Sequence, residues 1–164
     1  MQGDPKTRVL FVCLGNICRS PTAHGVFQAM LEREGLTGSI EVDSCGTGGW
    51  HAGEAPDQRA TAEAAARGYD LSPLRARQVR VADFGRFDYI LAMDRSNLAE
   101  LISLCPANFH GHLGLFLDFA PDAREKEVPD PYYGGEEGFS HVLDLVEQAS
   151  AGLLREIGDA RPMR

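Results

Sequence analysis

The order of hydrophobic and polar residues alternates between short strand-like segments and longer segments with helical spacing. The strand-like segments are residues 8–13, 40–45, 87–93 and 112–119. The first, Arg8-Val-Leu-Phe-Val-Cys13, is too short to span a membrane and is typical of a strand buried on both faces. Strands that alternate with helices indicate a parallel sheet with right-handed crossovers, which is an α/β fold.

The segment that follows residue 19 has the pattern of an amphipathic helix. Its apolar positions are Ala23, Val26, Phe27, Met30 and Leu31. Ser20 is a candidate N-cap, Pro21 suits the first helical position, and Gly35 is a candidate end. We therefore expect a strand, a short loop and a helix in direct succession.

Three further helices are predicted. Residues 56–68 are rich in alanine and end in a glycine. Asp94 can cap the next helix, whose expected apolar face is Leu98, Leu101, Ile102 and Cys105. The last helix covers residues 138–158, with an apolar face of Phe139, Val142, Leu143, Val146, Ala149 and Leu153.

The loop of residues 13–19 carries the candidate chemistry. It joins the end of a strand to the start of a helix, where open α/β sheets bind ligands and free N–H groups attract anions. Gly15 and Asn16 tolerate the positive φ that lets such N–H groups converge on one point. Arg19 adds a fork suited to phosphate, and a thiol at Cys13 would ionise more readily than a free cysteine. The loop therefore predicts a thiolate nucleophile inside an oxyanion-binding cradle.

Length, charge and cysteine content exclude several other classes of protein. One domain with a full core is expected for 164 residues. The net charge of −8 argues against nucleic acid as a partner, so an anionic substrate must be attracted by local positive groups. Four cysteines do not indicate a disulfide scaffold. No signal peptide, transmembrane segment or lipidation motif is visible, so we expect a cytoplasmic protein that does not bind membranes.

The string CLGNICRSP, residues 13–21, resembles the low-molecular-weight protein tyrosine phosphatase family, which has a Cys-x5-Arg-Ser signature. The resemblance covers about residues 8–158. It implies a single three-layer domain, with a four-stranded parallel sheet, helices on both faces and a phosphate-binding loop at the end of the first strand. It also implies that Cys13 is the nucleophile and that Arg19 binds phosphate. The remaining loop residues implied to contact the substrate are Leu14, Gly15, Asn16, Ile17, Cys18 and Ser20.

The ends of the chain are expected to lie outside this phosphatase domain. Residues 1–7 have the composition of a frayed terminus. Residues 159–164 are expected to form a C-terminal tail after the last helix.

A second stretch of resemblance, S-x-G-T-G-G-W-H, begins at Ser44. In the family this serine supports the phosphate loop through hydrogen bonds, and the aromatic residue, here Trp50, forms one wall of the cleft. The family often has a histidine that bonds this serine and the loop asparagine, and that position is Leu74 here. We therefore expect part of the supporting network to be missing or replaced. The glycines do not have the G-x-G-x-x-G spacing, so a dinucleotide site is rejected.

The segment VPDPYYGG, residues 128–135, carries the candidate general acid. Pro131 favours an extended backbone at Asp130, and a carboxyl group on such a loop can reach over a pocket. In the family, the aspartate of Asp-Pro-Tyr-Tyr protonates the leaving group and the tyrosines flank the substrate ring. These roles carry over to Asp130, Tyr132 and Tyr133. Asp94 is interpreted as a helix cap and not as part of the chemistry.

The reaction that the resemblance implies is hydrolysis of phosphotyrosine, or of another aryl phosphate monoester, through a phosphocysteine on Cys13. Arg19 and the loop N–H groups would hold the phosphate oxygens, and Asp130 would act first as acid and then as base. We expect Ser20 to stabilise the departing thiolate and Asn16 to hold the loop backbone. No metal or other cofactor is expected, because Arg19 and the loop supply the positive field. The expected partners are a phosphotyrosine-containing protein or a small aryl phosphate, with inorganic phosphate as product.

Three other functions are open at this point. Protein-arginine phosphatases share the scaffold but resemble C-x-G-N-T-C-R, whereas Ile17 and the tyrosine pair favour a flat phenyl ring. Arsenate reductases of this fold need a relay of further cysteines, and Cys105 stands alone after the third predicted strand. A non-catalytic phosphate-binding or redox-sensing module would not need Asp130. By resemblance, Cys18 forms a reversible disulfide with Cys13 under peroxide; the alternative is that it only fills space.

Overall fold

The computed structural model describes residues 6–131 and 136–160, which form an alternating series of strands and helices. The strands are β1 (Thr7–Cys13), β2 (Ile40–Gly46), β3 (Tyr89–Ala92) and β4 (His112–Leu115). The helices are α1 (Arg19–Glu34), α2 (Gln58–Ala66), α3 (Asp83–Arg86), α4 (Arg95–Leu104) and α5 (Glu136–Ala160), and a 3₁₀ helix, η1 (Phe116–Phe119), follows β4.

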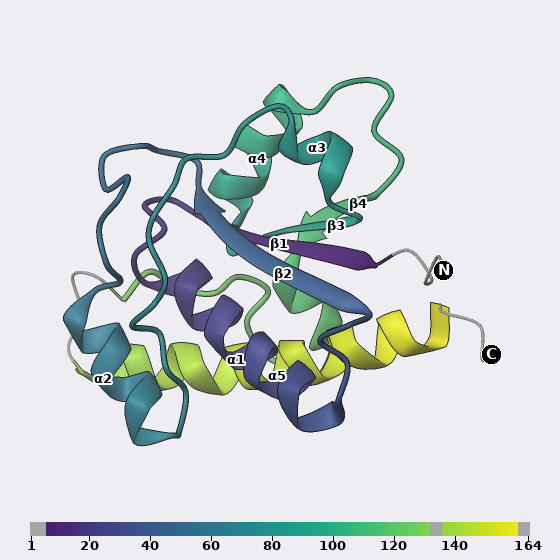
Figure 1. The fold of residues 1–164 in the computed structure, drawn as a ribbon. Helices are drawn as coiled ribbons and strands as arrows, with labels where there is room; N and C mark the ends of the chain where they lie inside the picture. The colour runs from purple at the N-terminus through teal and green to yellow at the C-terminus, as the bar shows by residue number, and fades with distance from the viewer. Residues whose placement is uncertain (1–5, 132–135, 161–164) are drawn as a thin grey trace.

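The four strands form one parallel sheet in the order β2-β1-β3-β4. Helices α1 and α5 cover one face of the sheet and α3 and α4 cover the other, while α2 lies beside α5 (Figure 1). The predicted three-layer α/β domain with four parallel strands is therefore confirmed. The topology makes β1 a central strand, so the loop that follows it leaves from the carboxyl edge of the sheet, where ligands bind in such folds.

Alternate residues of β1 pack into two separate cores. Val9, Phe11 and Cys13 belong to the core shared with α1 and α5, whereas Leu10 and Val12 belong to the core beneath α3 and α4. All five residues are at most 2% exposed. Burial on both faces explains why this strand is a continuous apolar run and not an alternating pattern. Cys13 is the last residue of the strand, directly before the loop.

Helix α1 begins earlier than the sequence pattern indicates. Its N-cap is Cys18, and Ser20, the predicted N-cap, lies inside the first turn with Pro21 after it. The prediction is wrong because the Ser20 hydroxyl lies within hydrogen-bond distance of the Cys13 thiol and does not cap the helix. The predicted end is confirmed, since Gly35 has a φ of 70° and terminates the helix in the left-handed region.

The predicted fourth strand is too long. It ends at Leu115, and the chain then turns into η1. Phe116 and Leu117 are both buried in the core shared with α1 and α5. Consecutive residues of a strand point to opposite faces, so a strand could not place both side chains in one core.

The buried face of α4 is narrower than its apolar spacing indicates. Leu101 is fully buried, but Ile102 is 58% exposed and Cys105 is the C-cap. The reason is that α4 covers the margin of the sheet, over β3 and β4, so that only one line of its side chains reaches the core.

Two elements extend beyond the ranges that the sequence pattern predicts. Strand β1 includes Thr7, and α5 continues through residues 159 and 160, which were assigned to the tail. Each extension adds backbone hydrogen bonds to an existing element, which apolar periodicity does not detect. Helix α5 has 25 residues, yet no helix within residues 6–131 and 136–160 is both long and apolar enough to cross a bilayer.

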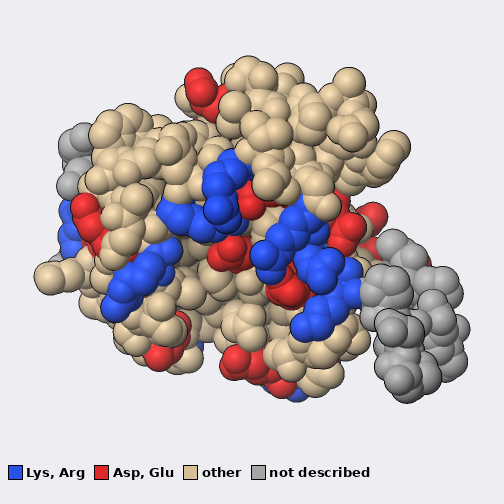
Figure 2. All heavy atoms as spheres, turned by 45° about the horizontal axis from the view of Figure 1, so that its top comes forward, with Lys and Arg blue, Asp and Glu red and all other residues tan. Residues whose placement is uncertain are grey.

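Charged side chains of both signs lie next to one another on the face turned forward in Figure 2. Among the ion pairs of the protein are Arg77 with Asp43 and Arg86 with Glu41. The net charge of −8 is therefore not expressed as a continuous acidic surface on this face.

Gly152 allows α5 to pack against the end of η1. A Cβ at this position would lie 1.8 Å from the Phe119 carbonyl oxygen, so Gly152→Ala requires the backbone to move. We expect the variant to lose about 1–3 kcal/mol of unfolding free energy in urea denaturation. Gly158→Ala, in the same helix but with no atom within 4 Å of its Cβ, should gain about 0.4–1 kcal/mol. Equal effects of the two substitutions would contradict this account of the packing.

Candidate active site

The loop between β1 and α1 turns sharply at Asn16. Its φ of 59° is the one positive value at a non-glycine residue among the residues described, and asparagine tolerates this conformation. The turn directs the Asn16 N–H at the Cys13 sulfur, at 3.3 Å. Hydrogen bonds from the N–H groups of Thr47 and Gly48 to the carbonyls of Cys13 and Leu14, both 2.9 Å, fasten the loop to the chain after β2.

The Cys13 thiol is buried and surrounded by hydrogen-bond donors. Its sulfur is 3.0 Å from the Ser20 hydroxyl, which in turn accepts a hydrogen bond from the Asn16 side-chain amide at 2.8 Å. The N-terminus of α1 begins a few residues further along and contributes its positive dipole end. The sulfur therefore faces hydrogen-bond donors and the positive end of a helix dipole.

Arg19 is held rigidly beside this thiol although its side chain is only 3% exposed. Its Nη1 donates to Asp94 Oδ2 at 2.7 Å and to the Val128 carbonyl at 3.0 Å. Its Nη2 lies 3.8 Å from Asp130 Oδ2. Burial opposes the charge, but Cys13, Asp94 and Asp130 outweigh it and hold the pKa of Arg19 above its ordinary value. The guanidinium is therefore a permanent, fixed positive charge at the base of the site.

Asp94 has a second contact that the sequence interpretation missed. It caps α4 as predicted, by accepting a hydrogen bond from the Asn97 N–H at 2.8 Å, and its other oxygen binds Arg19. One signal could have indicated this contact. Asp94 follows β3 almost directly, so it lies at the same carboxyl edge of the sheet as Cys13.

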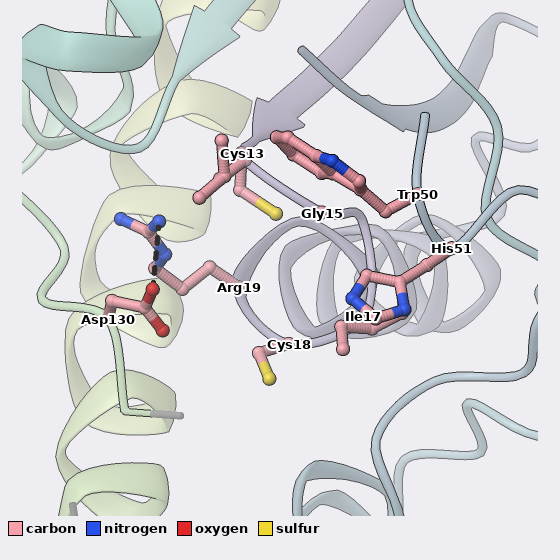
Figure 3. A pocket seen from close by; sticks show the side chains of 9 residues that line it. Cys13, Gly15, Ile17, Cys18, Arg19, Trp50, His51 and Asp130 are labelled. Carbon is pink, nitrogen blue, oxygen red and sulfur yellow. Dashed lines mark ion pairs between the residues drawn. The ribbon is translucent and has the colours of Figure 1, made fainter. Parts of the chain in front are cut away.

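A pocket of about 310 Å³ opens in front of the Cys13 sulfur (Figure 3). The residues that line it are Cys13, Leu14, Gly15, Ile17, Cys18, Arg19, Trp50, His51 and Asp130. Asp130 lies beside Arg19 on one side of the pocket, and Trp50 and His51 lie on the other. Three segments that are distant in the sequence therefore meet around one thiol.

His51 lines this pocket although the sequence analysis assigned it no role. Its Nδ1 is 2.9 Å from a Glu54 carboxylate oxygen. Its ring lies so close to Gly15 that a Cβ there would approach the imidazole to 2.9 Å. The segment S-x-G-T-G-G-W-H includes this histidine directly after Trp50, and that adjacency was the available signal.

Asn16 and Ser20 lie behind the pocket and not in its wall. They are 2% and 0% exposed, and their side chains bond each other and the thiol. Their position favours a role in supporting the loop over direct contact with a substrate.

Cys18 lines the pocket but is itself 5% exposed. Burial, followed by the nearby carboxylate of Asp57, raises the pKa of Cys18 well above that of a free cysteine. The residue is therefore present as a thiol and not as a second thiolate. The reversible disulfide with Cys13 stays a prediction.

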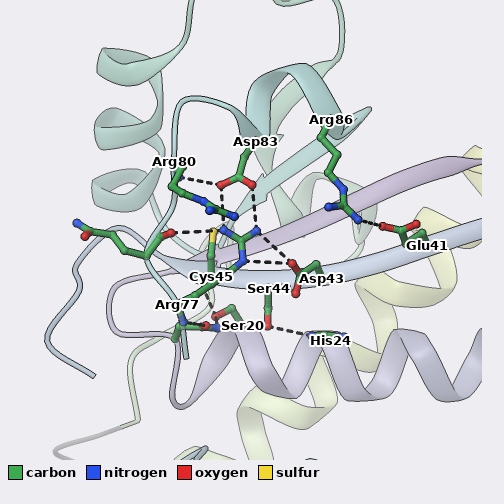
Figure 4. Close-up of polar contacts among 12 residues, drawn as sticks. Ser20, His24, Glu41, Asp43, Ser44, Cys45, Arg77, Arg80, Asp83 and Arg86 are labelled. Atoms are coloured by element: carbon green, nitrogen blue, oxygen red, sulfur yellow. Dashed lines mark hydrogen bonds and ion pairs between the residues drawn. The ribbon is translucent and has the colours of Figure 1, made fainter. Parts of the chain in front are cut away.

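The histidine that bonds Ser44 comes from α1 and not from the segment that the resemblance indicated. Its hydroxyl is 3.0 Å from Nδ1 of His24, on the second turn of α1 (Figure 4). Leu74, at the position where the family often has histidine, packs instead against the apolar cluster of α2. Two other groups therefore provide the contacts expected of that histidine. His24 is the partner of Ser44. The Arg77 N–H is the partner of the loop asparagine, because it donates to Asn16 Oδ1 at 3.0 Å.

Tyr132 and Tyr133 lie outside the described residues. Within residues 6–131 and 136–160, no group of three or more histidine, cysteine or acidic side chains is arranged to hold a metal ion.

Comparisons with known proteins agree on one family. Its profile, described as low molecular weight phosphotyrosine protein phosphatase, matches residues 8–162. A low molecular weight protein-tyrosine-phosphatase of Streptomyces coelicolor is 46% identical over 153 residues, which cover 92% of this chain and 93% of the relative. The crystal structure of a protein tyrosine phosphatase from Entamoeba histolytica superposes with a TM-score of 0.90 at 40% identity, covering 94% of this chain and 99% of that one. A Drosophila arginine phosphatase also superposes, with a TM-score of 0.85 at 29% identity over 91% of this chain and 96% of that one.

The buried environment of His24 makes a pH-dependent contribution to stability. Burial lowers the pKa of His24 below its ordinary value, and Asp43 only partly opposes the shift. Because the unfolded chain then binds a proton more readily than the folded one, this stability is present above about pH 6.5 and is lost as the pH falls. When the pH is lowered from about 7.5 to about 5.5, the unfolding free energy measured by urea denaturation should fall less for His24→Gln than for the wild type. His110→Gln, at an exposed position, is the control and should follow the wild type; parallel curves for all three proteins would contradict the assignment.

Proposed function

Because the chain belongs to the low molecular weight phosphotyrosine protein phosphatase family, we propose that it hydrolyses phosphotyrosine through a phosphocysteine on Cys13. The observation that carries this proposal is the pocket in which the thiol, the Arg19 guanidinium and the Asp130 carboxyl group all face one space of about 310 Å³. A nucleophile, a fixed cation and a proton donor are the three groups that cleavage of a phosphate monoester requires.

In the first step, the Cys13 thiolate attacks phosphorus in line with the ester oxygen. The S–P bond forms as the P–O bond to the phenol breaks, and Asp130 in its acid form gives its proton to the departing oxygen. Arg19 and the loop N–H groups hold the phosphate oxygens on which charge gathers. Asp94 contributes by keeping the guanidinium in place, since it binds Arg19 Nη1 at 2.7 Å and is not one of the residues that line the pocket.

In the second step, water cleaves the phosphocysteine. Asp130, now a carboxylate, takes a proton from water as the new O–P bond forms and the S–P bond breaks. The Ser20 hydroxyl, 3.0 Å from the sulfur, supplies a hydrogen bond to the departing thiolate. Inorganic phosphate leaves, and the enzyme returns to its starting form.

The shape of the pocket favours an aryl phosphate. Ile17 and Trp50 line it with an apolar side chain and an aromatic ring, which suit a flat phenyl group between the entrance and the thiol. The arginine phosphatase of Drosophila shares the fold, so the fold does not decide between the two substrates. We assign tyrosine on the basis of Ile17 and of the Tyr132–Tyr133 pair in the sequence.

The substrate that this function implies is a phosphotyrosine-containing protein or a small aryl phosphate, with no role for nucleic acid or membranes. We propose the cytoplasm as its compartment, because a reducing environment keeps the Cys13 thiol free. The four cysteines of the chain are all free in the structure.

The nucleophile assignment is tested with phosphopeptides. Peptides with phosphotyrosine, phosphoserine or phosphoarginine are compared in the presence of EDTA, with phosphate release as the readout. We expect a preference for phosphotyrosine, and we expect Cys13→Ser to abolish turnover. Cys105→Ser, at the end of α4 and outside the pocket, should keep full activity. Activity of Cys13→Ser would refute the mechanism, whereas a preference for phosphoarginine would refute the substrate.

The general-acid role of Asp130 is tested with leaving groups of different quality. Asp130→Asn should lower kcat/KM, which reports only the step in which the phenol departs, by about 10²- to 10⁴-fold for phenyl phosphate. The loss should be smaller for p-nitrophenyl phosphate, because nitrophenolate departs without a proton. Asp122→Asn, another exposed carboxylate of the same connection, is the control. Equal losses on both substrates would remove the acid role from Asp130.

A further inference from the structure

The segment of residues 76–79 lies against the end of β2, beside the phosphate loop. The Gly46 N–H donates to the Arg77 carbonyl at 2.9 Å, and the Val79 N–H donates to the Gly46 carbonyl at 2.8 Å. This pairing extends the edge of the sheet by one short bridge, from Gly46 to Gln78. The segment is therefore fixed to the end of β2.

The Arg77 side chain ties this segment to two other elements (Figure 4). Its guanidinium binds Asp83, at the start of α3, through both carboxylate oxygens at 3.0 and 3.1 Å. It also binds Asp43 of β2 at 3.1 Å. Asp83 is only 5% exposed and accepts a further hydrogen bond from the Arg80 N–H. Burial opposes the charge, but Asp83 and Asp43 outweigh it, so that the pKa of Arg77 lies above its ordinary value.

The Arg77 backbone reaches the catalytic thiol through two side chains. Its N–H donates to Asn16 Oδ1 at 3.0 Å. An N–H group can only donate, so the oxygen of the Asn16 side-chain amide must face Arg77. The NH₂ group of the same amide then faces the Ser20 hydroxyl, at 2.8 Å. The Ser20 oxygen accepts that bond, and its one proton can go to the sulfur at 3.0 Å or to the Cys45 carbonyl at 3.3 Å. A thiolate sulfur can only accept, so the charged form of Cys13 takes this proton as a hydrogen bond.

We propose that Arg77 is a positioning residue for the Cys13 nucleophile. Its side chain anchors the segment of residues 76–79, and its backbone N–H orders the donors Asn16 and Ser20 so that the last of them stabilises the thiolate. This inference rests on the proposed function only in taking Cys13 as the nucleophile. Arg77 touches neither the pocket nor the sulfur, so it acts entirely through the two side chains between them.

Arginine is required here because two carboxylates approach from different directions. The planar fork binds Asp83 with two parallel hydrogen bonds and still offers Nε and Nη2 to Asp43. Lysine has a single ammonium group and cannot reproduce this geometry. Arg77→Lys should therefore keep the charge but only part of the anchoring.

The test measures alkylation of Cys13 by iodoacetamide as a function of pH, read for each cysteine by peptide mass spectrometry. Because only the thiolate reacts, the midpoint of the profile reports its stabilisation, and the alkaline plateau reports access to the sulfur. For Arg77→Gln we expect the midpoint to rise by about one pH unit with an unchanged plateau. Arg77→Lys should give an intermediate midpoint. The loss of kcat/KM toward a phosphotyrosine peptide should be roughly tenfold at a pH below the midpoint and should shrink as the pH rises.

The groups around Cys13 that could distort such a profile are left unchanged in these variants. The charged and titratable groups that face it are Arg19, Asp130, His51, Cys18 and Cys45. A matched control is Arg67→Gln. Arg67 also pairs with two carboxylates and is also 26% exposed, but it joins the end of α2 to α5. Its midpoint should equal that of the wild type.

Two further variants separate positioning from damage to the fold. Arg77→Gln with Asp83→Asn removes the buried carboxylate that the single variant leaves unpaired, and it should show the same rise in midpoint with a melting temperature closer to that of the wild type. In a Ser20→Ala background, Arg77→Gln should cause no additional shift, because the last donor is already absent.

A wild-type midpoint in folded Arg77→Gln, or in the double variant if the single one does not fold, would overturn the proposal. An equal shift in Arg67→Gln would overturn it as well. Alkylation needs no substrate, so these outcomes are independent of phosphotyrosine turnover. If the wild type failed to hydrolyse phosphotyrosine while the midpoints moved as expected, only the proposed function would fail.

Discussion

The buried charge of Arg19 is the constraint on which the rest of the site depends. A guanidinium that is 3% exposed is strongly unfavourable unless it is paired and hydrogen-bonded. Its partners come from separate parts of the chain, namely Asp94 after β3 and the carbonyl of Val128. The Val128 N–H in turn donates to the Met93 carbonyl at 2.7 Å. Satisfying one charge therefore joins the loop after β1, the end of β3 and the segment that carries Asp130.

The capacity to bind an anion arises from local geometry and not from overall charge. The chain has a net charge of −8, and exposed charges more than about 8–10 Å away are largely screened at physiological salt. Inside the pocket, a phosphate would meet the backbone N–H groups of the loop, the N-terminus of α1 and one fixed guanidinium. Gly46 contributes to this geometry, because a Cβ there would lie 2.6 Å from the Leu14 carbonyl oxygen and would push the loop away.

Three polar side chains, Ser20, Asn16 and Ser44, lie behind the loop, and none of them lines the pocket. Ser20 and Asn16 connect the thiol to the Arg77 backbone, and Ser44 connects β2 to α1 through His24. The substitution of Leu74 for the histidine that the resemblance suggested therefore does not leave the network empty. His24 of α1 bonds Ser44, and the Arg77 N–H donates to Asn16.

The amino-acid sequence by itself determined the order of the four strands and of the four longer helices, and the loop between Cys13 and Arg19. These features depend on local spacing, because a strand end, a tight turn and a helix start fix the directions of residues a few positions apart. The tertiary structure decided which distant residues meet. The Arg19–Asp94 pair joins residues 75 positions apart, and the bond from Arg77 to Asn16 joins residues 61 positions apart. It also decided that Ser20 binds a thiol and does not cap a helix. These contacts depend on β1 lying between β2 and β3. The periodicity within one segment does not indicate which strands become neighbours.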